Sequence, residues 1–162
     1  MHKYTIEDEK KMCSKYSPGI VLNSEELYRI TLHPDHISSE GEVLPAAIST
    51  DDLERRGFSV ERERYSDNDI ICGIADKQVQ SKESREHAEL AKLGCGEIRN
   101  LSYEQTGNRS FLVIDDALEN NIAHASIYSA MQTSKKSILR KLRNQLSPFL
   151  NNRLPLDTLT TL

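Results

Sequence analysis

Short segments in which apolar and polar residues alternate constrain the fold of this chain more than any other feature of its sequence. In residues 28–32, Tyr28, Ile30 and Leu32 alternate with Arg29 and Thr31. Alternation with a period of two is typical of a strand with one buried face. The stretch FSVERER, residues 58–64, begins with the same pattern. Both segments are only a few residues long, so they predict a sheet of short strands.

Three further segments extend this prediction. The run DIICGIA, residues 69–75, is continuously apolar and rich in isoleucine, which favours a buried strand at the centre of the sheet. Residues 81–96 have apolar residues at helical spacing along one thin face and predict a surface helix covering the sheet. Residues 97–116 resemble two strands joined around the tripeptide TGN, which predicts a hairpin.

Two more helices are expected. Residues 49–57 combine acids in the first turn, arginines in the last and Gly57 at the end, which suits a short capped helix. Residues 122–146 carry apolar residues at near-helical spacing and predict one long helix or two abutting ones, ended by Pro148. The expected fold is α+β: a single small domain with a mostly antiparallel sheet, covered by two or three helices, of which the longest is at the C-terminus.

The length of 162 residues fits one domain. Residues 1–20 are polar and predict a flexible N-terminal arm, residues 21–150 form the domain, and residues 151–162 are a tail that either frays or docks as an extended strip. The sequence has neither an apolar run long enough to span a membrane nor an export signal. The three cysteines form no CxxC motif and suggest free thiols, so we expect a cytoplasmic protein that does not contact membranes.

The net charge of −4 is unevenly distributed. Six basic residues and no acid lie between Asn120 and Leu156, so the rest of the chain carries −10. On a helix, Lys136, Arg140 and Arg143 would lie along one side. Such a surface could bind the phosphates of a nucleic acid or a protein partner, could dock on the acidic remainder of the chain's own fold, or could simply be a solvated face. The sequence does not indicate an oligomeric state.

Histidines are the candidate residues for metal binding and for acid–base catalysis. His33 and His36 flank Asp35 in the loop after the first predicted strand. A metal site would need a third ligand, with His124 or Asp115 as the candidates. We favour a satisfied or solvent-facing pair, and expect neither a metal nor a cofactor. His124 lies among small and apolar residues, where it could be either a catalytic base or acid, or a core histidine bonded to a carbonyl.

Short patterns around these residues resemble those of known families. The string AHASI at His124 resembles one half of the two-histidine phosphoesterase motif, which implies that His124 and His36 act as base and acid on a phosphodiester. The order of Arg29, Ser59 and a late aspartate resembles that of ADP-ribosyltransferases, which implies that Arg29 holds a pyrophosphate.

A longer series of segments, LYR, HPDH, GEVLPAA, GFSVER and NIAHASI, runs from Leu27 to Ile127. It resembles a group of small uncharacterised bacterial proteins that have no assigned activity. This resemblance implies a shared site made of His36, Ser59 and His124.

Two functions follow from these observations. The first is an enzyme in which His36, His124 and Ser59 converge on a phosphate-bearing substrate, a nucleotide or a nucleic acid, bound with the help of Arg29. The second is a non-catalytic accessory or interaction module that binds a protein or nucleic acid through Lys136, Arg140 and Arg143. Phosphate-binding loops, the GxSxG motif and the HExxH motif are absent from the sequence.

Overall fold

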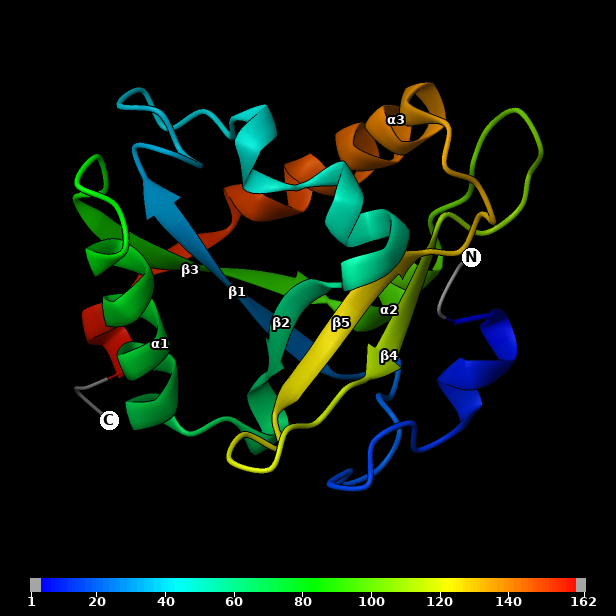
Figure 1. The fold of residues 1–162 in the computed structure, drawn as a ribbon, viewed down its shortest axis with the longest axis horizontal. Helices are drawn as coiled ribbons and strands as arrows, with labels where there is room; N and C mark the ends of the chain where they lie inside the picture. The colour runs from blue at the N-terminus through cyan, green and yellow to red at the C-terminus, as the bar shows by residue number, and fades with distance from the viewer. Residues whose placement is uncertain (1–3, 160–162) are drawn as a thin grey trace.

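A six-stranded antiparallel sheet forms the centre of the computed structural model, which describes residues 4–159 (Figure 1). The strands follow the order β4-β5-β2-β1-β3-β6 across the sheet, and every neighbouring pair is antiparallel. Their bounds are Glu26–His33 for β1, Phe58–Arg62 for β2, His87–Gly94 for β3, Phe111–Asp115 for β4, His124–Ser129 for β5 and Arg153–Pro155 for β6. The fold is therefore α+β, with the antiparallel sheet that the sequence predicts.

Helices cover both faces of the sheet. α1 (Asn68–Gln80) places Ile71 and Ala75 against Ile30 and Leu90 of β1 and β3. The main core lies on the opposite face, where α3 (Lys136–Leu146) contributes its buried leucines. Shorter helical segments are α2 (Cys95–Arg99), a π-helical turn at Asp52–Arg56, and 3-10 turns at Ile6–Lys10, Pro45–Ala47, Glu63–Tyr65, Ser147–Asn151 and Leu156–Leu159.

The alternating segments fold as predicted. β1 and β2 confirm the strands expected at 28–32 and 58–64, and β4 confirms the second strand of the segment 97–116. The helix expected at 49–57 is confirmed as a single π-helical turn, and Gly57 ends it with a positive φ of 91°. These segments were predictable because each shows its local signal within a few residues.

The prediction of a central strand at residues 69–75 is wrong, because this segment belongs to α1. Asp67 caps the helix by accepting hydrogen bonds from the N–H groups of Asp69 and Ile70. Ile71 and Ala75, four residues apart, form the buried stripe. A short apolar run fits a buried strand and a buried helix equally well, and tertiary packing decided in favour of the helix.

The helix predicted at residues 81–96 is wrong: its second half forms a strand, β3. β3 lies between β1 and β6, and both of its faces are covered: Ala88 and Leu90 face α1, whereas Ala91 and Leu93 face the main core. A strand buried on both sides loses the clean alternation of polar and apolar residues. The first strand of the predicted hairpin is also wrong, since α2 follows β3 directly.

The long helix predicted at residues 122–146 divides into β5 and α3. Within it, only the stretch from Lys136 onwards is helical, and its buried residues are Leu139, Leu142 and Leu146. α3 continues into the 3-10 turn Ser147–Asn151, so the longest continuous helical stretch lies towards the C-terminal end, as expected. Taken alone, α3 has 11 residues and α1 has 13.

Both terminal segments pack on the sheet. Instead of extending as a free arm, residues 4–20 are held through Glu9, whose carboxylate accepts hydrogen bonds from Arg109, Arg99 and the N–H of Val113. The tail docks as β6, which pairs with β3. Residues 1–3 and 160–162 lie outside the described residues. No helix within residues 4–159 combines the length and the apolar character needed to cross a membrane.

Candidate active site

Ser59 and His124 lie next to each other on two neighbouring strands. β2 and β5 pair with Ser59 opposite Ser126 and Glu61 opposite His124. The four side chains therefore share one face of the sheet, and Ser59 is a diagonal neighbour of His124. Nε2 of His124 lies 3.2 Å from the hydroxyl oxygen of Ser59. A serine and a histidine separated by 65 positions in the sequence thus form a direct contact.

The other ring nitrogen of His124 fixes the role of this contact. Nδ1 lies 2.8 Å from the backbone carbonyl oxygen of Asp116. A carbonyl can only accept a hydrogen bond, so Nδ1 carries the proton and donates it. In the neutral imidazole, Nε2 then has a free lone pair and accepts from the Ser59 hydroxyl. This is the arrangement of a nucleophile, its base and a group that orients the base.

The immediate surroundings of the pair are acidic. The Ser126 hydroxyl donates to the carboxylate of Asp116 at 2.8 Å. Glu61 is buried and accepts a hydrogen bond from the side-chain amide of Asn121. Burial raises the pKa of Glu61, against the lowering effects of Asn121 and His124. A substrate at Ser59 would therefore meet the carboxyl groups of Glu61 on β2 and of Asp116, which directly follows β4.

The pair is accessible. Ser59 is exposed, and His124 is half-buried. In Figure 1, β2 and β5 lie between α1 on one side and the N-terminal segment, drawn in blue, on the other. α1 packs against β1 and β3, and the N-terminal Tyr4 packs against Tyr128 near β4. The Ser59 hydroxyl is therefore accessible from solvent.

His36 does not join this pair. It lies beyond the end of β1, beside a hollow that it lines with Asp35, Ala46, Lys82, Ser84 and Arg85. Its Nδ1 accepts a hydrogen bond from the N–H of Leu32 at 3.2 Å. Burial, followed by the positive charges of Arg29 and Arg85, lowers the pKa of His36 to about 4. His36 therefore stays neutral with one nitrogen occupied, and the structure shows no contact between it and Ser59 or His124.

Arg29 is close to Ser59 in the backbone but on the other face of the sheet. Its Nη1 donates to the carbonyl oxygen of Ser59 at 2.8 Å, and its guanidinium lies 4.0 Å from the centre of the Phe58 ring. Phe58 belongs to the main core, whereas the Ser59 hydroxyl points to the opposite face. Burial lowers the pKa of Arg29 to about 10, partly offset by Asp52. Arg29 thus supports the strand but does not reach the hydroxyl.

The cations of α3 lie apart from the pair. Lys136 forms an ion pair with Asp51, with 3.2 Å between Nζ and the carboxylate oxygen. Arg140 is exposed and Arg143 half-buried, and within residues 4–159 neither has an acidic partner within 4 Å. One of the three cations is therefore already neutralised within the fold, which weakens the predicted binding surface.

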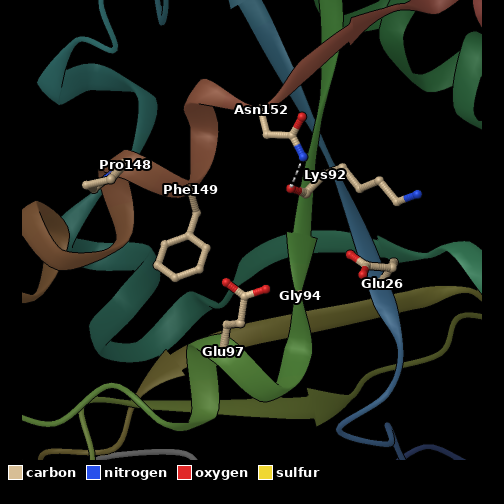
Figure 2. A pocket seen from close by; sticks show the side chains of 7 residues that line it. All are labelled: Glu26, Lys92, Gly94, Glu97, Pro148, Phe149 and Asn152. Atoms are coloured by element: carbon tan, nitrogen blue, oxygen red, sulfur yellow. Dashed lines mark hydrogen bonds between the residues drawn. The ribbon is translucent and has the colours of Figure 1, made fainter.

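Another hollow lies apart from the Ser59 and His124 pair. It has a volume of about 560 Å³ and lies where β1 and β3 meet α2 and the 3-10 turn after α3 (Figure 2). Figure 2 shows the ring of Phe149 beside the carboxylate of Glu97, and the side chain of Asn152 bonded to the carbonyl of Lys92. The hollow is lined by neither a histidine nor a serine, so it offers no pair of nucleophile and base.

One group of possible metal ligands was missed by the sequence analysis. His33, His87 and Glu89 lie together at the end of β1 and the start of β3. The three residues come together only through the cross-strand pairing of β1 and β3. A helix at residues 81–96, as predicted, would not have placed His87 and Glu89 beside His33. Of the third ligands expected for His33, Asp115 lies instead beside Arg62, 3.8 Å from its Nη1, and His124 is bonded to Asp116 and Ser59.

No protein-family model, no curated protein and no solved structure matches this chain. The resemblances drawn from short sequence patterns therefore stay predictions.

Proposed function

We propose that this chain is a hydrolase or acyltransferase in which Ser59 is the nucleophile and His124 is its general base. The observation that carries the proposal is the hydrogen-bonded series from Ser59 through His124 to the Asp116 carbonyl. The carbonyl fixes the tautomer that a base needs, and the 3.2 Å contact is within the range for proton transfer.

The proposed reaction has two steps, the acylation of Ser59 and the hydrolysis of the acyl-serine. The Ser59 oxygen attacks the carbonyl carbon of an ester while its proton passes to Nε2 of His124, and that proton then leaves with the alcohol as the C–O bond breaks. Water next attacks the acyl-serine, gives a proton to the same nitrogen, and the acid departs as Ser59 regains its proton. During both steps the Asp116 carbonyl stabilises the imidazolium through Nδ1–H.

The charges near the pair favour a neutral substrate. The Asp116 carboxylate lies beside the pair, where it accepts a hydrogen bond from Ser126, and a carboxylate repels phosphate groups. Arg29, the predicted phosphate ligand, faces the other side of the sheet. We therefore favour a neutral ester over the phosphate-bearing substrate that the sequence patterns imply.

A fluorophosphonate probe tests the nucleophile directly. Reaction forms a bond between the Ser59 oxygen and phosphorus, releases fluoride and passes the serine proton to His124. We expect one label per chain at Ser59, none in Ser59→Ala, and a labelling rate reduced about 100-fold or more in His124→Gln, the usual contribution of a general base. Ser134→Ala, which removes an exposed serine, is the matched control and should label normally.

The substrate class needs a second measurement. Wild-type protein should hydrolyse p-nitrophenyl acetate faster than Ser59→Ala, and should leave p-nitrophenyl phosphate unchanged. Turnover of the phosphate alone, dependent on Ser59, would overturn the neutral-ester assignment and favour the phosphate-bearing substrate. Equal labelling of wild type and Ser59→Ala, or no labelling of either, would overturn the proposed nucleophile.

A further inference from the structure

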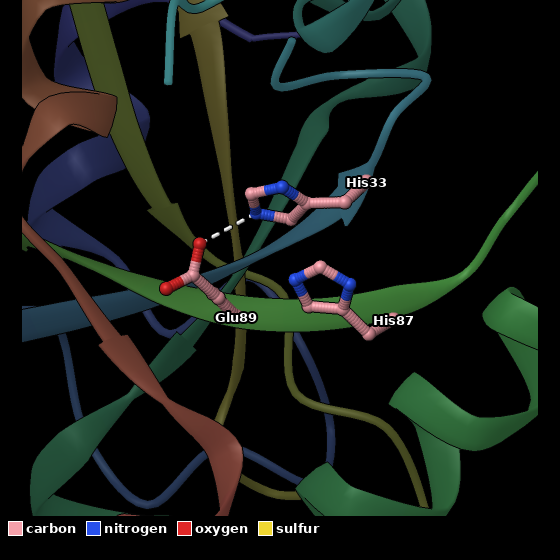
Figure 3. Close-up of side chains that lie close together, drawn as sticks. All are labelled: His33, His87 and Glu89. Atoms are coloured by element: carbon pink, nitrogen blue, oxygen red, sulfur yellow. Dashed lines mark ion pairs between the residues drawn. The ribbon is translucent and has the colours of Figure 1, made fainter. Parts of the chain in front are cut away.

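His33, His87 and Glu89 form a cluster built by strand pairing. His33 and His87 are directly opposite each other in the register of β1 and β3, and Glu89 is two residues further along β3 on the same face. The two imidazole rings stack with their centres 4.2 Å apart and their planes inclined by 15°. Figure 3 shows a nitrogen of each ring turned towards the side where the Glu89 carboxylate lies. Three potential metal ligands thus converge where the end of β1 pairs with the start of β3.

The donor atoms are close enough to share one ion. One ligand atom from each residue can be chosen so that all three lie within 4.8 Å of one another. In a tetrahedral zinc site with ligand distances near 2.0 Å, neighbouring donors are about 3.3 Å apart. His87 is exposed and Glu89 half-buried, so small side-chain rotations can close this difference without moving the strands.

The contact between His33 and Glu89 is short. Nε2 of His33 lies 2.5 Å from Oε1 of Glu89, yet it is buried without a hydrogen bond of acceptable geometry. An imidazole nitrogen binds a metal ion through its lone pair. The contact with Glu89 already places this nitrogen beside the carboxylate that would share the ion.

We propose that His33, His87 and Glu89 bind one Zn²⁺ ion, with solvent at the fourth position. Two imidazoles and one carboxylate are a ligand set that zinc accepts readily, and three protein ligands leave the open position found in catalytic zinc sites. The proposal is independent of Ser59 and His124, since none of the three ligands belongs to that pair.

Arg153 limits the affinity. Its Nε lies 3.5 Å from the same Oε1 of Glu89 that approaches His33. The guanidinium competes with a cation for this carboxylate, and also donates to the carbonyl oxygens of Leu150 and Gly41. We therefore expect Arg153→Gln, which removes the charge, to bind zinc several-fold more tightly than the wild type.

Titration calorimetry of the full chain with ZnCl₂ alone tests the site. We expect one zinc per chain, and at least ten-fold weaker binding in His87→Ala and in Glu89→Gln. Glu86→Gln removes an exposed neighbouring carboxylate and should bind like the wild type. MgCl₂, which prefers an all-oxygen octahedral site, should not bind. Zinc should also raise the melting temperature of the wild type and not of His87→Ala.

Cobalt substitution checks which ligands are used. Cobalt bound to nitrogen and oxygen should show only ligand-field bands, whereas a thiolate charge-transfer band would place the ion on one of the free cysteines and overturn the proposal. Absence of a one-to-one zinc complex, or equal affinity in the wild type, His87→Ala and Glu89→Gln, would also overturn it.

Discussion

Removal of Glu25 should destabilise the protein strongly, because Glu25 is the partner of a fully buried arginine. Arg62 is the largest completely buried side chain described, and its side chain is 1% exposed. Its Nε and Nη2 donate to the two carboxylate oxygens of Glu25 at 2.8 and 2.7 Å. Nη1 and Nη2 also donate to the carbonyl oxygens of Gly19 and Ile20. The pair therefore ties β2 to the segment before β1.

The expected loss follows from this geometry. Glu25→Ala deletes a two-pronged charged contact and leaves the guanidinium buried without its counter-charge, which costs about 3–5 kcal/mol. In a domain of this size, such a loss lowers the melting temperature by roughly 6–20 °C. Replacing both partners, as Glu25→Leu with Arg62→Met, should cost less than Glu25→Ala alone, because no unpaired charge stays buried.

Urea unfolding followed by circular dichroism measures these free energies. Asp115 is a possible substitute partner, since its carboxylate lies 3.8 Å from Nη1 of Arg62 and both its oxygens lack a hydrogen bond. Asp115→Asn is therefore combined with Glu25→Ala, so that no carboxylate can take over. If the free energy of unfolding of this double variant falls by less than about 1 kcal/mol, the reasoning is refuted, because an unpaired buried charge destabilises a protein by more than that.

Two other predictions concern stability. Gly57→Ala should cost about 1–3 kcal/mol in urea unfolding: its φ is 91°, and a methyl group would lie 2.9 Å from side-chain atoms of Ser126 and Tyr128. Gly73→Ala, within α1 and with open space around it, should stabilise instead, and a loss in both variants would contradict the argument. Acid should also destabilise the protein through Glu9: burial raises its pKa, but Arg109 and the Val113 N–H lower it overall. Because the folded-state pKa is the lower one, this contribution is present above the unfolded pKa near 4.5 and is lost as the pH falls through the folded value. Stability measured from pH 7 to pH 3 should fall less steeply in Glu9→Gln, and an unchanged slope would refute this role.

Some segments of this chain have a local sequence signal for their structure, whereas others depend on packing against distant neighbours. β1 and the turn ending at Gly57 were predictable because their signals are local. The helical spacing within residues 136–146 was also predictable, although the start of that helix was not. By contrast, the predictions for α1 and β3 were wrong: the isoleucine-rich run is a helix, and the alanine-containing run is a strand next to the edge strand β6. Local propensity differs little between these states, so burial against neighbours decided each of them.

The candidate site shows the same division. Ser59 and His124 could be selected from the sequence, and the structure joins them; His36 could be selected equally well, and the structure places it elsewhere. His87 and Glu89 gave no recognisable signal, since their meeting with His33 depends on the register of β1 and β3.

The sequence by itself determined an α+β domain, the two alternating strands and the residue types available for chemistry. Only the tertiary structure decided that β5 pairs with β2, which brings together side chains 65 positions apart. The physical reason is that strand pairing is a long-range choice: it is fixed by the burial of both sheet faces and by backbone hydrogen bonds, and neither is encoded within a short window of residues.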